Sequence, residues 1–537
     1  MPGVGASACS VCTVSDSTPN QAAPAAETSN EADVPSSPPS QPAPAPDAEP
    51  TSDAAAEPDG AIAAEPEPDA IDLSGLPPGF VWGAATSAFQ IEGAADQRGQ
   101  SIWDTFCHEP GRIRDGSDAS VACDHVHRYA EDVGLLRTLG VDAYRFSIAW
   151  PRVQPTGQGP LDPKGLAFYD RLLDELLGAG IDPWITLYHW DLPQTLQNLG
   201  GWPVREVADR FADYAVAVHA ALGDRVRNWT TLNEPWCSAW LGYASGHHAP
   251  GATDIGLAAK AAHHLLLAHG QAVIGMRAQA PADHALGIVL NLGSYRAADS
   301  LPPPEVEQVQ AAVTELDGVH TRWWLDALLL GTYPQDTYTA LAPHLDGVVA
   351  DGDLDVISQP VDFLGVNYYS DQLVQPRERG GSVPVPELTE AAAVSLVAGG
   401  PGATTMGWPV TPDGLRVLLR RVSENYPPIP LVVTENGSAW HDSRSALQVR
   451  EGTPPPPIPD PPRVAYLRAH LAALAAAAQQ GVDVQGYFAW SLLDNFEWGY
   501  GYTQRFGLVR VDFDTGDRRI RSSFETYRAL IAAQRAG

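Results

Sequence analysis

Short apolar runs alternate with longer helix-like segments along most of this 537-residue chain. The runs that predict β-strands lie at residues 81–84, 143–147, 183–187, 228–231, 286–290, 363–366, 431–433 and 486–489. The helix-like segments include residues 126–139, 166–179, 207–222 and 256–279. Eight such alternations indicate an α/β fold. Closure into a barrel is the simplest way to leave no edge strand, although an open doubly wound sheet fits the same count.

Two short strings place a glutamate at the end of a predicted strand. Glu234 lies in TLNEP (231–235), after the apolar run 226–230, and Glu435 lies in VTENG (433–437), after 429–433. A single glutamate at a strand end is usually a solvated surface group. Two carboxylates on facing strand ends are instead typical of the catalytic groups of a glycosidase, in which one protonates a leaving oxygen and the other attacks the sugar.

At these strings the chain closely resembles glycoside hydrolase family 1, the β-glucosidase family, whose acid/base string is TxNEP and whose nucleophile string is TENG. The resemblance covers about residues 73 to 535 and includes FVWGAATSAFQIEG (80–93), LYHWDLP (187–193) and FLGVNYY (363–369). It implies a (β/α)8 TIM barrel, which decides between the closed and the open sheet, and a single catalytic domain at residues 73–537.

The resemblance implies that Glu234 is the acid/base and Glu435 the nucleophile. Arg145 and Tyr369 match family residues that donate to the nucleophile, and such donors would lower its pKa. Glu234 is expected to face a more apolar wall, formed by Trp236 and its neighbours, that raises its pKa.

Pro235 bears on the backbone of the residue before it. A proline disfavours α geometry at the preceding position, so Glu234 is predicted to be held extended.

The resemblance also implies a set of sugar-binding residues, which are Gln90, His189, Trp190, Asn233, Asn367, Trp408, Trp490, Glu497, Trp498 and Phe506. An amide such as Gln90 can both donate to and accept from adjacent hydroxyls. Asn233 is expected to bind the 2-hydroxyl, whose contacts strengthen in the transition state. Glu497 is expected to bind O4 and O6, and its charge would repel a 6-phosphate. Trp408 and Trp236 are candidates for the aglycone subsite, although packing in the core explains such aromatics equally well.

The predicted function is therefore that of a retaining β-glucosidase acting on cellobiose and on aryl or alkyl β-glucosides. No metal or cofactor is implied, because carboxylates and water suffice. The alternatives are a β-galactosidase or β-fucosidase, a 6-phospho-β-glucosidase disfavoured by Glu497, and a non-catalytic sugar-binding homologue disfavoured by the two glutamates. A thioglucosidase would carry glutamine in place of Glu234. The sequence does not decide among glucose, galactose and fucose, nor the oligomeric state.

The first 72 residues differ from the rest in composition. They contain 13 acidic residues and neither lysine nor arginine. Such a segment has too little apolar surface to offset the entropy of ordering and is predicted to be a disordered tail. It has no basic or apolar region typical of a secretory signal. The remaining residues carry −19 of the formal charge of −32, which argues against nucleic acid and anionic membranes as partners.

The cysteines number five, at positions 9, 12, 107, 123 and 237. This odd number argues against a disulfide framework and favours the reducing cytoplasm. Cys9 and Cys12 form a CxxC pair, but the pair lacks a second set of ligands and does not predict a zinc site. No apolar run is long enough to span a membrane. Long loops are expected at about 370–405 and 442–462, where they would shape the substrate entrance.

Overall fold

The computed structural model describes residues 71–536, apart from 381–387, 389, 401, 444–446 and 448–454. Most of the predicted tail therefore lies outside the described residues, together with Cys9 and Cys12. The chain divides into two units, Met1–Pro68 and Asp69–Gly537, and the described residues belong to the second.

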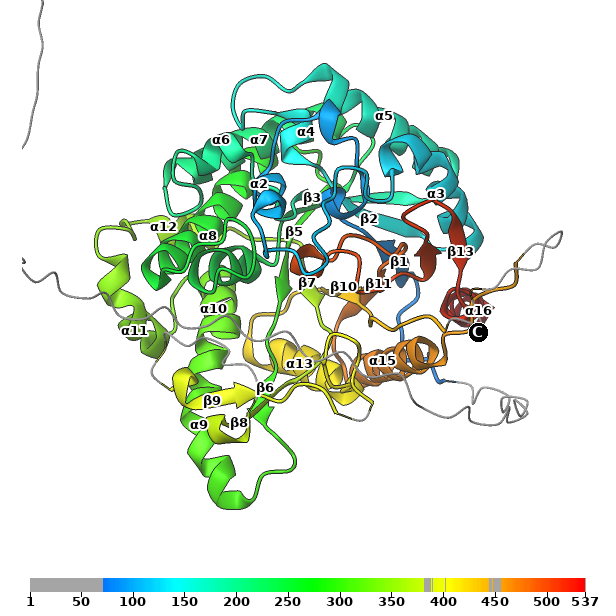
Figure 1. Cartoon of the computed structure of the whole chain (residues 1–537). Helices are drawn as coiled ribbons and strands as arrows, with labels where there is room; N and C mark the ends of the chain where they lie inside the picture. The colour runs from blue at the N-terminus through cyan, green and yellow to red at the C-terminus, as the bar shows by residue number, and fades with distance from the viewer. Residues whose placement is uncertain are drawn as a thin grey trace, which may run out of the picture. The chain divides into compact units, whose positions relative to one another are not determined.

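A closed barrel of eight parallel strands forms the centre of this second unit among the described residues (Figure 1). The barrel strands are β1 (Val81–Ala85), β2 (Ala143–Ser147), β3 (Asp182–Tyr188), β4 (Asn228–Asn233), β5 (Ala285–Asn291), β7 (Phe363–Asn367), β10 (Leu431–Asn436) and β11 (Val484–Trp490). They follow chain order around the ring, and β1 pairs with β11 to close it. The TIM barrel predicted from the sequence is confirmed, and each predicted strand is present with its ends shifted by at most three residues.

Helices surround this barrel (Figure 1). The longer ones are α3 (His125–Leu139), α5 (Pro163–Gly178), α7 (Glu206–Leu222), α8 (Ile255–Arg277), α9 (Pro303–Asp317), α13 (Pro412–Asn425), α15 (Pro461–Gln479) and α16 (Ser522–Ala536). The shorter ones are α1 (Ala88–Ile91), α2 (Ile102–His108), α4 (Trp150–Val153), α6 (Gln194–Gln197), α10 (Trp323–Leu330), α11 (Gln335–Leu345) and α12 (Asp353–Ile357). The last helix, α16, contacts both α15 and α3. In the described part of the chain, no helix combines the length and apolar character needed to cross a membrane.

The barrel interior is filled by large apolar side chains. Trp184 of β3 lies between Phe363 of β7 and Phe488 of β11, with ring centroids 5.3 Å and 5.1 Å away. All three rings belong to one buried cluster that also contains Trp490 at the carboxyl end of β11. The interior is therefore a packed core, and polar side chains can only gather above it, where the strands end.

The segment at about 370–405 was expected to be a loop, and this expectation was wrong. It contains β8 (Gln372–Pro376) and β9 (Val394–Leu396), which form a three-stranded sheet with β6 (Tyr295–Ala297). These strands are short and depend on pairing with a distant segment, so local composition does not indicate them. A second small sheet joins β12 (Val509–Val511) to β13 (Arg518–Ile520). Residues 444–446 and 448–454 of the other expected loop lie outside the described residues.

Candidate active site

Two buried carboxylates lie at the carboxyl ends of the barrel strands. Glu234 follows β4 directly, and Glu435 lies in β10, in register with Asn367 of β7. Glu234 is only 6% exposed and Glu435 only 3%. A buried carboxylate is unfavourable unless it is hydrogen-bonded or protonated, so the partners of each group determine what it can do.

Glu435 is held by two donors. Arg145 of β2 donates from Nη1 to Oε1 at 2.6 Å, and the Tyr369 hydroxyl donates to Oε2 at 2.6 Å. The Arg145 side chain is itself buried, at 1% exposure. From the sequence, we expected both residues to contact Glu435. An ion pair on one oxygen and a short charge-assisted hydrogen bond on the other fix the orientation of the carboxylate.

Glu234 has a different environment. Burial raises its pKa to about 8, and the negative charge of Glu435 adds to this effect. Asn367 donates from Nδ2 to Oε1 at 2.7 Å, and the Cys237 thiol donates to Oε2 at 3.2 Å. The direction of the pKa shift agrees with the sequence expectation, and Glu234 carries a proton at neutral pH.

The backbone of Glu234 differs from the expectation. Its φ is +46°, in the left-handed region, so the prediction of an extended backbone was wrong. Pro235 disfavours right-handed α geometry at this position, but it leaves more than one alternative open. Three of the six described non-glycine residues with positive φ are Trp190, Glu234 and Trp498, and such outliers concentrate at functional sites.

Polar side chains connect the two carboxylates. Asn233 Oδ1 accepts from Arg145 Nη2 at 2.7 Å and from Asn367 Nδ2 at 3.1 Å. Because this oxygen is the acceptor, Asn233 Nδ2 faces His189 Nε2, at 3.1 Å, as a donor. Burial and the charge of Arg145 hold the pKa of His189 well below its usual range. His189 is therefore neutral, accepts through Nε2 and carries its proton on Nδ1.

A third carboxyl group, Glu497, lies near this pair. It is partly exposed, and loss of hydration together with the charges of Glu435 and Glu234 raises its pKa to about 8. Gln90 Nε2 lies 3.5 Å from Glu497 Oε2 and 2.9 Å from both the Asn495 side chain and the Phe496 carbonyl. Gln90 is thus engaged mainly with the segment that carries Glu497.

The remaining predicted aromatics form two groups. His189 stacks on Trp490 and Trp498, with centroids 5.9 Å apart in each case, and Trp190 lies 4.5 Å from Trp498. The Trp190 indole donates to the Asn233 carbonyl at 2.9 Å. The other group consists of Tyr369, Trp408 and Phe506, whose centroids lie 5.4 to 6.1 Å apart. The partly exposed Trp408 therefore packs against Tyr369, which donates to Glu435.

Gly437, the last residue of the second string, is required by packing. A Cβ at this position would lie 1.7 Å from the Trp490 carbonyl oxygen. Only glycine therefore lets β10 end this close to β11, which brings Glu435 and Trp490 to the same edge of the barrel.

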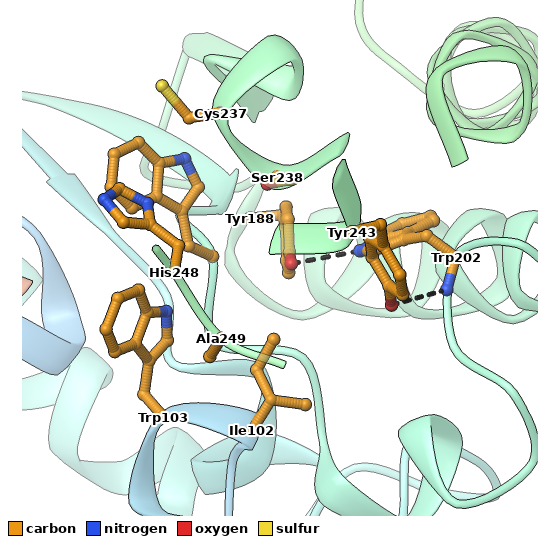
Figure 2. A pocket seen from close by; sticks show the side chains of 10 residues that line it. Ile102, Trp103, Tyr188, Trp202, Cys237, Ser238, Tyr243, His248 and Ala249 are labelled. Atoms are coloured by element: carbon orange, nitrogen blue, oxygen red, sulfur yellow. Dashed lines mark hydrogen bonds between the residues drawn. The ribbon is translucent and has the colours of Figure 1, made fainter. Parts of the chain in front are cut away.

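A small cavity of about 10 Å³ is lined by Cys237, whose thiol contacts Glu234 (Figure 2). Its lining includes Trp190, Trp103 and His248, and Cys237 and Ser238 line it from the π-helical segment η2 (Cys237–Ala244), but neither glutamate does. The volume is comparable with the space that one water needs. The cavity is therefore a packing space behind the site and is too small for a sugar.

The chain matches the family model described as glycosyl hydrolase family 1 over residues 73–536. The chain belongs to this family. It is therefore a glycosyl hydrolase, as the sequence predicted.

Its relatives include a thermostable β-glucosidase B from Thermobispora bispora, 46% identical over 86% of this chain and 91% of the relative. A bifunctional β-D-glucosidase/β-D-fucosidase from Bifidobacterium breve is 47% identical over 85% of this chain and 98% of the relative. Among solved structures, a psychrophilic β-glucosidase from Micrococcus antarcticus superimposes with a TM-score of 0.78 at 45% identity, over 86% of this chain and 98% of the other.

The sequence reasoning missed the surroundings of Cys237, which it treated only as a reduced cysteine. Asn291 Nδ2 donates to Cys237 Sγ at 3.3 Å and lies 3.0 Å from His320 Nε2. Trp236, expected to form the wall beside Glu234, stacks on His320 with ring centroids 3.8 Å apart. The only local signal is the spacing of Cys237, which lies three residues after Glu234 on a helical segment.

Proposed function

We propose that this glycosyl hydrolase is a retaining β-glucosidase that cleaves terminal β-D-glucosyl residues from cellobiose and from aryl or alkyl glucosides. The observation that carries the proposal is that the two buried carboxyl groups have different environments. Glu435 is paired with Arg145 and Tyr369, whereas the pKa of Glu234 is raised to about 8. One carboxyl group with a raised pKa and a second that is held by two donors are what an acid and a nucleophile require.

In the first half-reaction, Glu435 attacks the anomeric carbon while Glu234 gives its proton to the departing glycosidic oxygen. The bond from the anomeric carbon to that oxygen breaks, and a glycosyl ester forms on Glu435. The ester carries no charge, so the repulsion that helps to keep Glu234 protonated disappears. In the second half-reaction, Glu234 takes a proton from water, the water oxygen bonds to the anomeric carbon and Glu435 departs as carboxylate.

The assigned binding residues surround this reaction centre. Asn233, which Arg145 and Asn367 hold from one side, is assigned to the sugar 2-hydroxyl. Glu497 is assigned to O4 and O6, and Trp490 to an apolar face of the sugar. The glucosidase/fucosidase relative makes β-fucosides the second candidate substrates. Free thiols at the described cysteines Cys107, Cys123 and Cys237 support the cytoplasm as the proposed compartment.

Methanolysis of an aryl β-glucoside followed by NMR tests the retaining mechanism. The first methyl glycoside formed is expected to be the β-anomer, and an α-anomer would refute the proposal. A panel of nitrophenyl β-glycosides then ranks glucose against fucose and galactose.

The Glu234→Ala variant tests the acid/base assignment separately. Its kcat should fall far more for poor leaving groups than for dinitrophenolate, which departs without protonation. Equal losses for both classes of leaving group would contradict the role of Glu234.

A further inference from the structure

The sulfur of Cys237 lies between the proposed acid/base and a chain of buried polar groups. Its thiol donates to Glu234 Oε2, and Asn291 Nδ2 donates to the sulfur. The second Asn291 Nδ2 hydrogen points to His320 Nε2, and His320 Nδ1 lies 2.7 Å from the Tyr295 hydroxyl. Burial lowers the pKa of His320 to about 3, so the ring is neutral and accepts from Asn291.

These contacts determine the direction of the hydrogen bonds behind the sulfur. Because both amide hydrogens of Asn291 are used, the sulfur is an acceptor toward Asn291. Its single hydrogen is then free to point at Glu234. Burial and the charge of Glu234 hold the pKa of the Cys237 thiol well above its usual range, so the donor does not ionise.

We infer that Cys237 is a positioning residue for Glu234, which orients the carboxyl group through a weak S–H donor anchored from behind by Asn291. This inference rests on the proposed role of Glu234 as acid/base. The choice of sulfur has a physical reason. A hydroxyl in the same place would be a stronger donor to the ionised carboxyl and would pull its proton off at lower pH. A thiol fixes the orientation with little effect on the acid.

Other charged groups also act on Glu234 and have to be considered. Glu435 raises its pKa, and Arg145 lowers it. Glu497 lies near enough for Glu234 to raise its pKa. These three groups stay in place when Cys237 is replaced, so a shift in the alkaline limb of the pH profile between variants at this position reports the S–H contact.

The test compares Cys237→Ser with Cys237→Val in the full-length chain, with kcat/KM measured across pH on an aryl glucoside. Serine should move the alkaline limb to lower pH by about half to one unit, whereas valine, which lacks a donor, should move it upward by about 0.3 unit. Asn291→Ala should shift the alkaline limb upward, in the same direction as Cys237→Val. Cys107→Ser, which changes a cysteine of α2 outside the site, is the matched control and should keep the wild-type profile.

A second measurement separates positioning from loss of stability. Loss of orientation in Cys237→Val should reduce kcat/KM several-fold more for a methyl glucoside than for a dinitrophenyl glucoside, at an unchanged melting temperature. If the serine and valine variants both keep the wild-type alkaline limb and leaving-group dependence, the inference is wrong, even if Glu234→Ala behaves as an acid/base variant. If Glu234→Ala itself shows no leaving-group dependence, the proposed function fails instead.

Discussion

Replacing Glu497 with glutamine tests the assignment that determines sugar preference. The change keeps the size and shape of the side chain and removes its ability to carry charge. Among the described residues, the donor to this carboxyl is Gln90 Nε2, at the long distance of 3.5 Å, so most of its accepting capacity is left for a ligand. Sugar hydroxyls that donate to Glu497 favour its ionised form and so oppose the raised pKa of the ligand-free site. A hydrogen bond to this charged acceptor contributes roughly 1.5–3 kcal/mol, which corresponds to a loss of about 10- to 150-fold in kcat/KM for a glucoside.

The assay compares nitrophenyl β-glucoside with its 6-deoxy analogue in wild type and in Glu497→Gln. The 6-deoxy substrate lacks O6, so its kcat/KM with the wild-type enzyme should already be lower than that of the glucoside. Glu497→Gln should therefore reduce kcat/KM less for the 6-deoxy substrate than for the glucoside. The difference between the two losses measures the coupling between Glu497 and O6. Equal losses on both substrates would show that Glu497 does not contact O6, and its assignment to the far edge of the sugar would have to be abandoned.

Further predictions concern the nucleophile, stability and the N-terminal segment. Glu435→Ala should abolish turnover on all glycosides, and azide should restore activity with an α-glycosyl azide as product; a β-product would contradict the role. The raised pKa of Glu497, about 8 against 4.5, means that the folded state binds this proton more tightly. Its stabilisation is complete below pH 4.5 and is lost as pH rises through about 8, so Glu497→Gln should flatten the fall in unfolding free energy over this range in denaturant titrations. Deleting residues 1–70 should leave kcat and KM on a small glucoside nearly unchanged; a tenfold fall in kcat/KM would show that the segment contributes to the site.

The sequence predicted the eight strands because they are buried on both faces and read as short apolar runs, and the family resemblance decided for the closed barrel over the open sheet. The resemblance predicted the contacts of Arg145 and Tyr369 with Glu435, because each residue lies at a strand end within a motif that matches the family. The strands and the motifs are local features of the sequence, and the parallel arrangement of the strands brings the motifs to one end of the barrel.

What the sequence did not predict depends on tertiary contacts or on finer backbone choices. Cys237, Asn291 and His320 come from three separate segments, and no local pattern shows that they meet. Pro235 limits the backbone of Glu234 without choosing between the extended and the left-handed conformation. The strands β8 and β9 exist because they pair with β6, so a composition rich in glycine and proline conceals them.

The pairing of β1 with β11 has a consequence for biosynthesis. Until residues 484–490 have emerged from the ribosome, the free edges of β1 and β10 have no partner, and such edges can pair with other chains. A further contact to β1 forms later still, because Tyr527 of α16 donates its hydroxyl hydrogen to the Gly83 carbonyl at 2.8 Å. A nascent chain truncated before this helix should therefore depend on chaperones, and enzymatic activity should appear only after nearly the whole polypeptide has been made.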